Sequence, residues 1–232
     1  KTAYEMCGRD WSSDVCSSDL NGTASGCSES SGLLTSTSAG TCTVTATMAG
    51  DTNYVPVSSS ATTVTIGKAP LTVTAADQSV AYGSAASTVT GAGSVTYSGF
   101  VNSETSSVVS GSVSYTTTYT SSTDAGTSGV VVTPVVSGLS ATNYSFTAVS
   151  GTVTITKLSQ SALTLTSTSG TYGTAITLAT SGGTTGGSVS YTVANGTASG
   201  CSESSGLLTS TSAGTCTVTA TMAGNTNYDA VS

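Results

Sequence analysis

The feature that most constrains this chain is the alternation of threonine with apolar residues. Residues 215–222 read Thr-Cys-Thr-Val-Thr-Ala-Thr-Met, so every odd position is threonine and every even position is apolar. Successive side chains of a β-strand point to opposite faces, so this period of two predicts a strand with one face in a core. Residues 163–165 and 188–193 repeat the pattern, and glycine-rich breaks such as Gly182-Gly183 fit turns. Many short strands at this spacing predict an all-β fold of antiparallel sandwiches.

An internal repeat gives the domain organisation. Residues 21–50 recur without change at 195–224, which is an offset of 174 residues (195 minus 21). This period is too long for a solenoid unit and suits two domains per period. Strand-like runs that end near Lys68 and Lys157 divide the period. Neither junction has a Gly/Ser-rich or Pro-rich spacer, so we expect semi-rigid connections between domains.

The predicted domains follow from these boundaries. We expect the C-terminal part of a truncated domain at 21–67, a complete domain at 68–157, and a further domain at 158–232. Aligned with 21–67, the last of these stops before its final strand, the counterpart of Thr62–Ile66. An unpaired sheet edge invites association, so Thr62–Ile66 of one chain is a candidate to fill the edge of another.

Residues 1–20 resemble translated DNA rather than a protein segment. Residues 10–20 (DWSSDVCSSDL) back-translate to a string that resembles the read-primer part of a short-read sequencing adapter, and residues 1–5 (KTAYE) resemble its flow-cell end. We therefore expect 1–20 to be an adapter artefact without packed structure. Its Trp11, Cys7 and Cys16 carry no functional argument.

Charge and composition exclude several classes of function. The formal net charge is −7; without 1–20, seven acids and two bases remain, which is −5. Such a surface repels phosphate, so we expect no nucleic-acid partner, and no apolar run is long enough for a membrane span. The chain contains no histidine, which rules out Ser-His and Cys-His catalysis, and no calcium-loop pattern is present. We expect no enzyme activity, no cofactor and no metal site.

The quoted motifs resemble domains of bacterial surface proteins. Residues 158–232 resemble an Ig-like repeat domain, on Thr171-Tyr172-Gly173-Thr174, the segment around Cys201, residues 213–220 and Asn227-Tyr228; residues 21–67 resemble its C-terminal half. Residues 68–157 resemble an MBG domain, on residues 71–75, 81–83, 98–102, 138–139, 143–144 and 151–155. Ser103-Glu104 stands where the MBG pattern more often has Gly-Asp. The resemblance implies tandem antiparallel Ig-like sandwiches around an MBG-type β-domain, with at most a short helix.

Four cysteines outside 1–20 form two equivalent pairs, Cys27 with Cys42 and Cys201 with Cys216. A metal site would need about four cysteine and histidine ligands, and a redox site would need a C-x-x-C motif or a nearby base. A disulfide within each Ig-like domain remains, with two buried free thiols as the alternative. Such a bond indicates an oxidising compartment.

Aromatic residues give weaker indications. Tyr54, Tyr144 and Tyr228 each follow an asparagine near the last strand of a domain. They fit either a ligand platform or, in the reading we favour, a packed ring with its hydroxyl bonded at a loop. Tyr115 and Tyr119 lack this context and are candidates for exposure. Residues 100–109 lack alternation, and a short helical turn is expected there.

Together these features predict a structural stalk or spacer segment of a large repetitive adhesin-type protein at the extracellular bacterial cell surface. Its partners are then neighbouring repeat domains of the same chain. The alternative is that the modules themselves bind carbohydrate or a host glycoprotein, which a large exposed aromatic or apolar patch would favour. A third reading is homotypic contact through free sheet edges.

Overall fold

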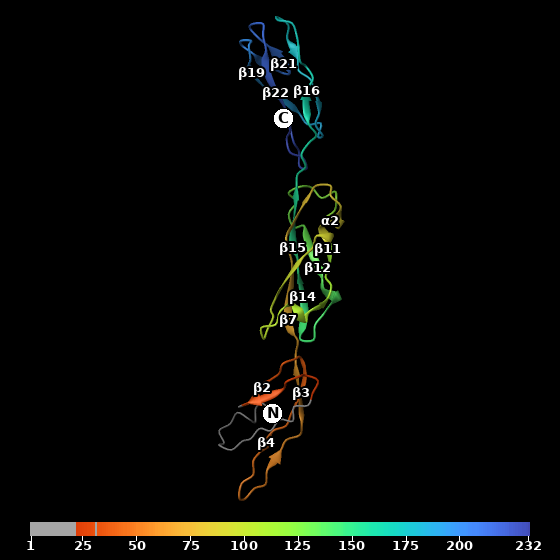
Figure 1. The fold of residues 1–232 in the computed structure, drawn as a ribbon, viewed down its shortest axis with the longest axis vertical. Coiled ribbons are helices and arrows are strands. Elements are labelled where there is room, and N and C mark those ends of the chain that lie inside the picture. Colours follow the sequence, from red (N-terminus) through yellow and green to blue (C-terminus); the bar gives the residue numbers. More distant parts are fainter. Residues whose placement is uncertain (1–21, 31) are drawn as a thin grey trace. The chain divides into compact units, whose positions relative to one another are not determined.

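The structure is a computed structural model that describes residues 22–30 and 32–232 (Figure 1). The segment 1–20, for which we predict an adapter artefact, lies outside these residues. The described chain consists of short strands in several sheets, with one short α-helix and two 3₁₀ turns. This confirms the predicted all-β class. Among the described residues, no helix is both long and apolar enough to cross a membrane.

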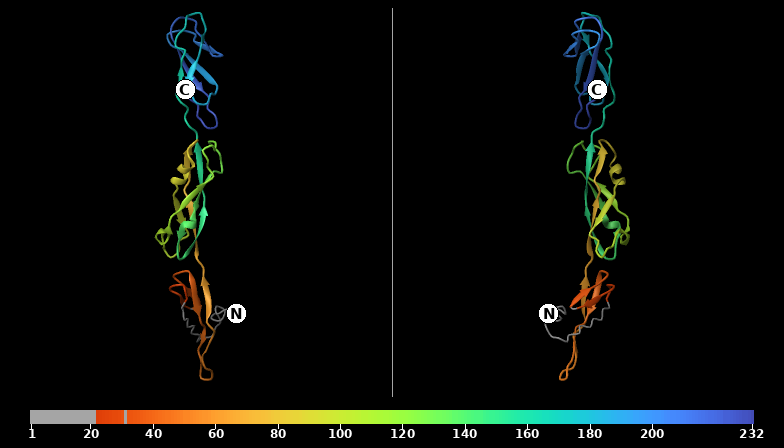
Figure 2. Two further views of the ribbon diagram at one scale, coloured as in Figure 1. Left: turned by 90° about the vertical axis from the view of Figure 1, so that its right-hand side faces the viewer. Right: turned by 60° about the vertical axis from the view of Figure 1, so that its left-hand side comes forward.

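The chain divides into two compact units. The first takes residues up to Ala76 together with 93–116 and 133–150, and the second takes 77–92, 117–132 and 151–232. The predicted domain 68–157 is therefore shared between the units, and the boundaries at Lys68 and Lys157 stay predictions. Figure 2 allows the strands of each unit to be followed in two further views.

Five small sheets lie wholly within the described residues of the first unit. Two-stranded antiparallel pairs join β1 (Ser28–Ser30) to β2 (Leu33–Thr35), β3 (Gly40–Val44) to β6 (Thr62–Ile66), β4 (Thr47–Met48) to β5 (Val57–Ser58), and β10 (Ser110–Gly111) to β13 (Leu139–Ser140). The fifth sheet has the order β14 (Tyr144–Val149), β7 (Ala69–Ala75), β9 (Val95–Ser98). The 3₁₀ turns η1 (Ser106–Val108) and η2 (Val136–Gly138) also belong to this unit.

The core of the first unit is built on β7. Leu71 and Val73 are fully buried and alternate with threonines on the other face, as period two requires. β14 lies parallel to β7, with Tyr144 opposite Ala69, while β9 lies antiparallel on the other side. Leu71 and Tyr144 share one buried cluster with Ala141, against which the rings of neighbouring aromatic residues pack.

Three small sheets lie wholly within the second unit, together with β8, β15 and the first two residues of β12 from a larger, four-stranded sheet. The larger sheet has the order β11 (Ser114–Thr117), β12 (Val131–Val135), β15 (Gly151–Thr156), β8 (Gln78–Ala81). The smaller ones join β16 (Leu163–Leu165) to β18 (Thr180–Gly182), β17 (Ile176–Thr177) to β21 (Leu207–Thr209) and β20 (Ser202–Ser204), and β19 (Val189–Asn195) to β22 (Cys216–Met222). The helix α2 (Ala86–Gly91) follows β8.

Tyr119 corrects a prediction from the sequence. We expected this ring to be a candidate for exposure, but it is only 1% exposed. Its hydroxyl donates to the carbonyl oxygens of Ala81 and Ser84, at 3.3 and 3.0 Å. A buried tyrosine needs such a partner for its hydroxyl, and the turn after β8 supplies it. Tyr115, the other candidate, is half-buried.

Of the helical segments, η1 agrees with a prediction from the sequence, whereas α2 does not. η1 lies inside the stretch 100–109 where a short helical turn is predicted, and the Thr105 side chain caps it by accepting from the Ser107 amide. α2 was not predicted, because its sequence ASTVTG contains β-branched residues and glycine, which are weak helix formers. Its Val89 is 1% exposed and fixes the helix on the core.

Candidate functional site

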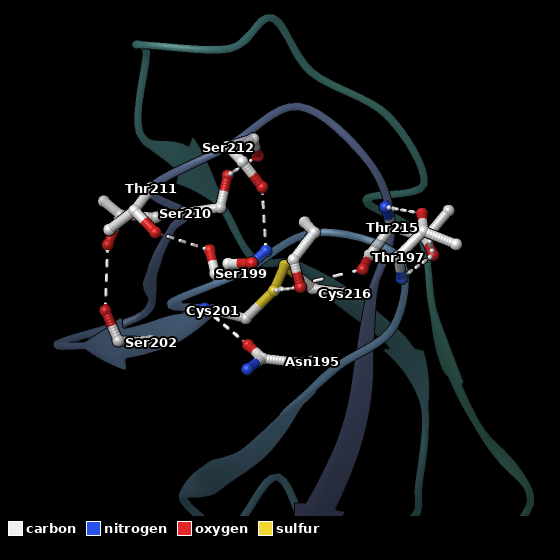
Figure 3. Close-up of a disulfide and its surroundings, with 12 residues drawn as sticks. Asn195, Thr197, Ser199, Cys201, Ser202, Ser210, Thr211, Ser212, Thr215 and Cys216 are labelled. Atoms are coloured by element: carbon white, nitrogen blue, oxygen red, sulfur yellow. Dashed lines mark hydrogen bonds between the residues drawn. A yellow bond between two sulfur atoms is a disulfide. The ribbon is translucent and has the colours of Figure 1, made fainter.

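Each repeat copy carries a disulfide at the same place. Cys201 is bonded to Cys216 (Figure 3), with a Cα–Cα distance of 5.9 Å, and Cys27 is bonded to Cys42, with a Cα–Cα distance of 6.1 Å. The bond joins the loop after β19 to the first residue of β22. Asn195, the last residue of β19, holds the loop from the other side by accepting from the Cys201 amide at 2.8 Å. The disulfide therefore anchors a loop and leaves no free thiol among the described residues.

The hydroxyl groups around this disulfide are engaged by the backbone. Thr197 and Thr215 each accept from the other's amide, at 2.9 and 3.0 Å, and their hydroxyls lie 3.1 Å apart (Figure 3). Thr23 and Thr41 make the same three bonds in the first copy. Serine and threonine are thus abundant in these loops because their side chains satisfy backbone groups that the short strands leave unpaired. These loops read as structural, and the residues that could position a neighbouring domain lie at the boundaries.

The first boundary is held by a lysine and an asparagine. Lys68 donates from Nζ to the Ala141 carbonyl at 2.8 Å, and the Ala69 amide donates to the Asn143 carbonyl at 2.8 Å. The Asn143 side chain then accepts, through Oδ1, from the Ala39 amide at 3.1 Å. Ala39 lies just before β3, in the predicted domain 21–67, whereas Asn143 lies in 68–157. Within the first unit, one asparagine therefore connects residues of two predicted domains.

The second boundary repeats this construction. Lys157 donates from Nζ to the Asn225 carbonyl at 2.8 Å, and the Leu158 amide donates to the Asn227 carbonyl at 2.9 Å. The Asn227 side chain accepts from the Ala125 amide at 2.8 Å and donates to the Asp124 carboxylate at 2.8 Å. The two boundaries belong to different compact units, yet the same residue types make the same bonds at both.

The tyrosine after each asparagine has its own environment. Tyr144 is 1% exposed; its hydroxyl accepts from the Val101 amide at 3.0 Å and donates to the Glu104 carboxylate. Burial, followed by the bond to Glu104, raises the pKa of the Tyr144 phenol above its usual value. The Tyr228 ring packs edge-on against Tyr82 at a centroid distance of 6.2 Å. Tyr54, by contrast, is 76% exposed.

The turn that serves Tyr144 explains the departure noted at Ser103-Glu104. Ser103 has φ of 59° and Asn102 has φ of 53°, which is the left-handed region that glycine adopts most readily. The turn closes with the Glu104 amide donating to the Val101 carbonyl at 3.0 Å. Serine keeps the turn in place of the more usual glycine, and Glu104 stays within reach of Tyr144.

The predicted site residues thus fall into two groups. The four cysteines pair within their own repeat copies, each bond joining a loop to a strand, and none of them takes part in the boundary bonds. The sequence argument used two lysines only as boundary markers and two asparagines only as parts of family motifs. In the structure, Lys68 and Asn143 meet at the first boundary. Lys157 and Asn227 meet at the second. The recurrence of Asn-Tyr after each Lys boundary is the signal that could have indicated this. Within residues 22–30 and 32–232, no three histidine, cysteine, aspartate or glutamate residues gather as a metal-binding group.

Comparison with known proteins gives one family match. Residues 71–154 match the family model of the MBG domain (YGX type). The triplet Tyr82-Gly83-Ser84 fits that description: Gly83 has φ of 80°, and the Ser84 carbonyl accepts from Tyr119. No curated protein and no solved structure matches the chain. MBG domains are found in extracellular surface proteins, and the two disulfides fit such a location.

Proposed function

We propose that the chain is a stalk segment of a large, repetitive bacterial surface protein, in which Ig-like domains at 21–67 and 158–232 flank the MBG domain. In this function the chain acts as a spacer and not as an enzyme, and its partners are the neighbouring domains. The MBG match supports an extracellular surface-protein repeat. The loops around the disulfides support a structural role, because their threonine side chains form hydrogen bonds with backbone amides.

The observation that carries the proposal is the repeated boundary. Only Gly67 and Lys68 separate β6 from β7, and Leu158 pairs directly with Tyr228 two residues after β15. At each boundary a lysine, a backbone amide and an asparagine side chain form hydrogen bonds, as described above. A linker of this kind lacks the freedom of a flexible spacer, so neighbouring domains are expected to reorient little. Limited reorientation is what a spacer needs to hold a distal domain away from the cell.

Residual dipolar couplings of the whole chain test this proposal. For the wild type we expect residues 117–132 and 158–232 to report one alignment tensor. In the variant Asn227→Ala, which loses the bonds to Ala125 and Asp124, the couplings of 158–232 should shrink relative to those of 117–132.

The chain offers a matched control. Asn53 occupies the equivalent place in the first repeat copy, and its side chain makes no hydrogen bond to another described residue. Asn53→Ala should therefore leave the couplings of both segments unchanged. Independent tensors in the wild type would contradict the stalk.

A second function has one observation in its favour. The β4–β5 hairpin exposes Met48, Tyr54, Val55 and Val57, each by more than half. An apolar patch on one module favours binding of carbohydrate or a host glycoprotein. The repeat offers a structural explanation of this exposure, because the equivalent Met222 is buried and the equivalent Tyr228 is half-buried against Tyr82 in the second unit. A glycan array probed with the wild-type chain and with the Tyr54→Ser variant distinguishes the two explanations. The variant should lose signal only if this surface binds a glycan.

A further inference from the structure

One sequence motif supplies the loop that receives the asparagine at both boundaries. The motif Ser-Thr-x-Ala-Gly-Thr, which we call the socket loop, occurs once in each predicted domain, at residues 36–41, 122–127 and 210–215. At the first boundary the amide of its alanine, Ala39, donates to the Asn143 side chain at 3.1 Å. At the second boundary the amide of Ala125 donates to the Asn227 side chain at 2.8 Å. An Ig-like loop and an MBG loop therefore present the same donor to an asparagine.

The asparagine side of each boundary is also a repeated motif. Asn143 and Asn227 stand in the triplet Thr-Asn-Tyr, at 142–144 and 226–228. Both asparagines are half-buried, and each belongs to the predicted domain that follows its socket loop along the chain. Each boundary is therefore a joint of the same two parts, one socket loop and one Thr-Asn-Tyr loop.

The socket loops differ at the position x, which is serine in the two Ig-like copies. The Ser38 hydroxyl accepts from the Ser25 amide at 2.6 Å, inside its own predicted domain. Ser212 makes the same bond with the Ser199 amide, at 2.8 Å (Figure 3). A serine at x therefore uses its side chain to brace the loop against its own domain.

In the MBG loop the position x is Asp124, and its side chain reaches across the boundary. The carboxylate accepts from Nδ2 of Asn227 at 2.8 Å, while Oδ1 of the same asparagine accepts from Ala125. Both polar atoms of the Asn227 side chain are thus held, one of them by a charged group, and charge-assisted hydrogen bonds are roughly twice as strong as neutral ones. At the first joint, Nδ2 of Asn143 donates instead to the Thr37 carbonyl, at 3.5 Å.

From these observations we propose that the socket loop recognises the Thr-Asn-Tyr loop of the following domain, and that residue x sets how firmly the joint is held. Serine at x leaves the asparagine with one short bond, whereas aspartate holds both of its polar atoms. Asp124 is therefore a positioning residue, and the joint after the MBG domain is the firmer of the two. This role of Asp124 rests on the proposed stalk function and adds to it that the two joints are unequal.

Amide hydrogen exchange of the full chain, read residue by residue by NMR, tests the role of Asp124. The Ala125 amide donates across the boundary, so its protection factor reports how much of the time the joint is closed. In Asp124→Ser this factor should fall about tenfold, because the bond to a charged group is lost. Asp124→Asn keeps an oxygen acceptor of the same shape without the charge, so the factor should fall less. The Gly126 amide, which donates to the Ile155 carbonyl at 3.1 Å within 68–157, should keep its protection in both variants.

The Ala39 amide is the matched control, since it reports the first joint and should exchange equally in all three chains. Equal protection of Ala125 in the three chains would overturn the role of Asp124. A loss that includes Gly126 in both variants would also overturn it, because Asp124 would then only hold its own loop. If Asn227→Ala weakens the dipolar couplings while Ala125 ignores both Asp124 variants, the stalk stands and the role of Asp124 falls. Independent alignment tensors in the wild type would remove both.

Discussion

The disulfide of 158–232 allows a quantitative prediction. Replacing both Cys201 and Cys216 by alanine opens a loop with a sequence separation of 15. In the chain-entropy model a loop of this length contributes about 3 kcal/mol at 25 °C. The Cys201 amide keeps its bond to Asn195, so the folded loop loses little besides the cross-link. We therefore expect opening of this domain to become roughly 100-fold more frequent, since each 1.4 kcal/mol is tenfold.

Hydrogen exchange read by mass spectrometry is the suitable assay, because a chain with several domains does not unfold as one unit. Peptides from 189–195 and 216–222 should lose protection by about 3 kcal/mol, whereas peptides from 69–75 should not change. The variant without Cys27 and Cys42 is the matched control, since it opens an identical loop elsewhere. A loss below about 1 kcal/mol, or one that spreads to 69–75, would refute the reasoning that the bond acts locally through the unfolded state.

Two further predictions concern residues 68–157. Leu71→Ala should lower the free energy of unfolding of this domain by about 2–5 kcal/mol in urea denaturation, because Leu71 is fully buried. Leu33→Ala is the control, since Leu33 is 62% exposed and its loss should change the free energy of unfolding by less than about 0.5 kcal/mol. Similar losses in the two variants would contradict the assigned core. The Thr152 amide, 2.7 Å from Asp77, lowers the pKa of that carboxyl below its ordinary 3.8, so its stabilisation is present above pH 3.8 and is lost as pH falls through the lowered value. The melting temperature should therefore fall in acid less steeply in Asp77→Asn than in the wild type, and identical slopes would show that the bond does not form in solution.

Local patterns in the sequence predict strands better than they predict neighbours. The alternation at 215–222 indicates β22 correctly, since it depends only on which side chains face the core. The same pattern cannot distinguish parallel from antiparallel pairing. β7 with β14 and β8 with β15 are parallel pairs between segments about 75 residues apart, and no local signal marks them. The short α2 was missed for a related reason, because the burial of Val89 outweighs its weak helix propensity.

The candidate site was predicted even less completely. Each boundary depends on an asparagine that bonds to a residue about 100 positions away, as Asn143 does with Ala39. A sequence shows the asparagine and the lysine but not the carbonyl and amide groups that they meet. Tyr119 illustrates the same limit, since its burial follows from the position of the turn after β8. Side chains that bond to backbone groups are therefore placed by the fold and leave little trace in composition.

The parallel pairs have a consequence for a domain under tension. A force on 68–157 would enter through Lys68, before β7, and leave through Lys157, after β15. β7 would then be drawn toward its N-terminal end, while β14, which leads into β15, would be drawn toward its C-terminal end. Because β7 and β14 run parallel over six residue pairs, the two strands would be sheared along each other. Their hydrogen bonds would carry the load together instead of opening one at a time, and β15 with β8 repeats this geometry in the second unit.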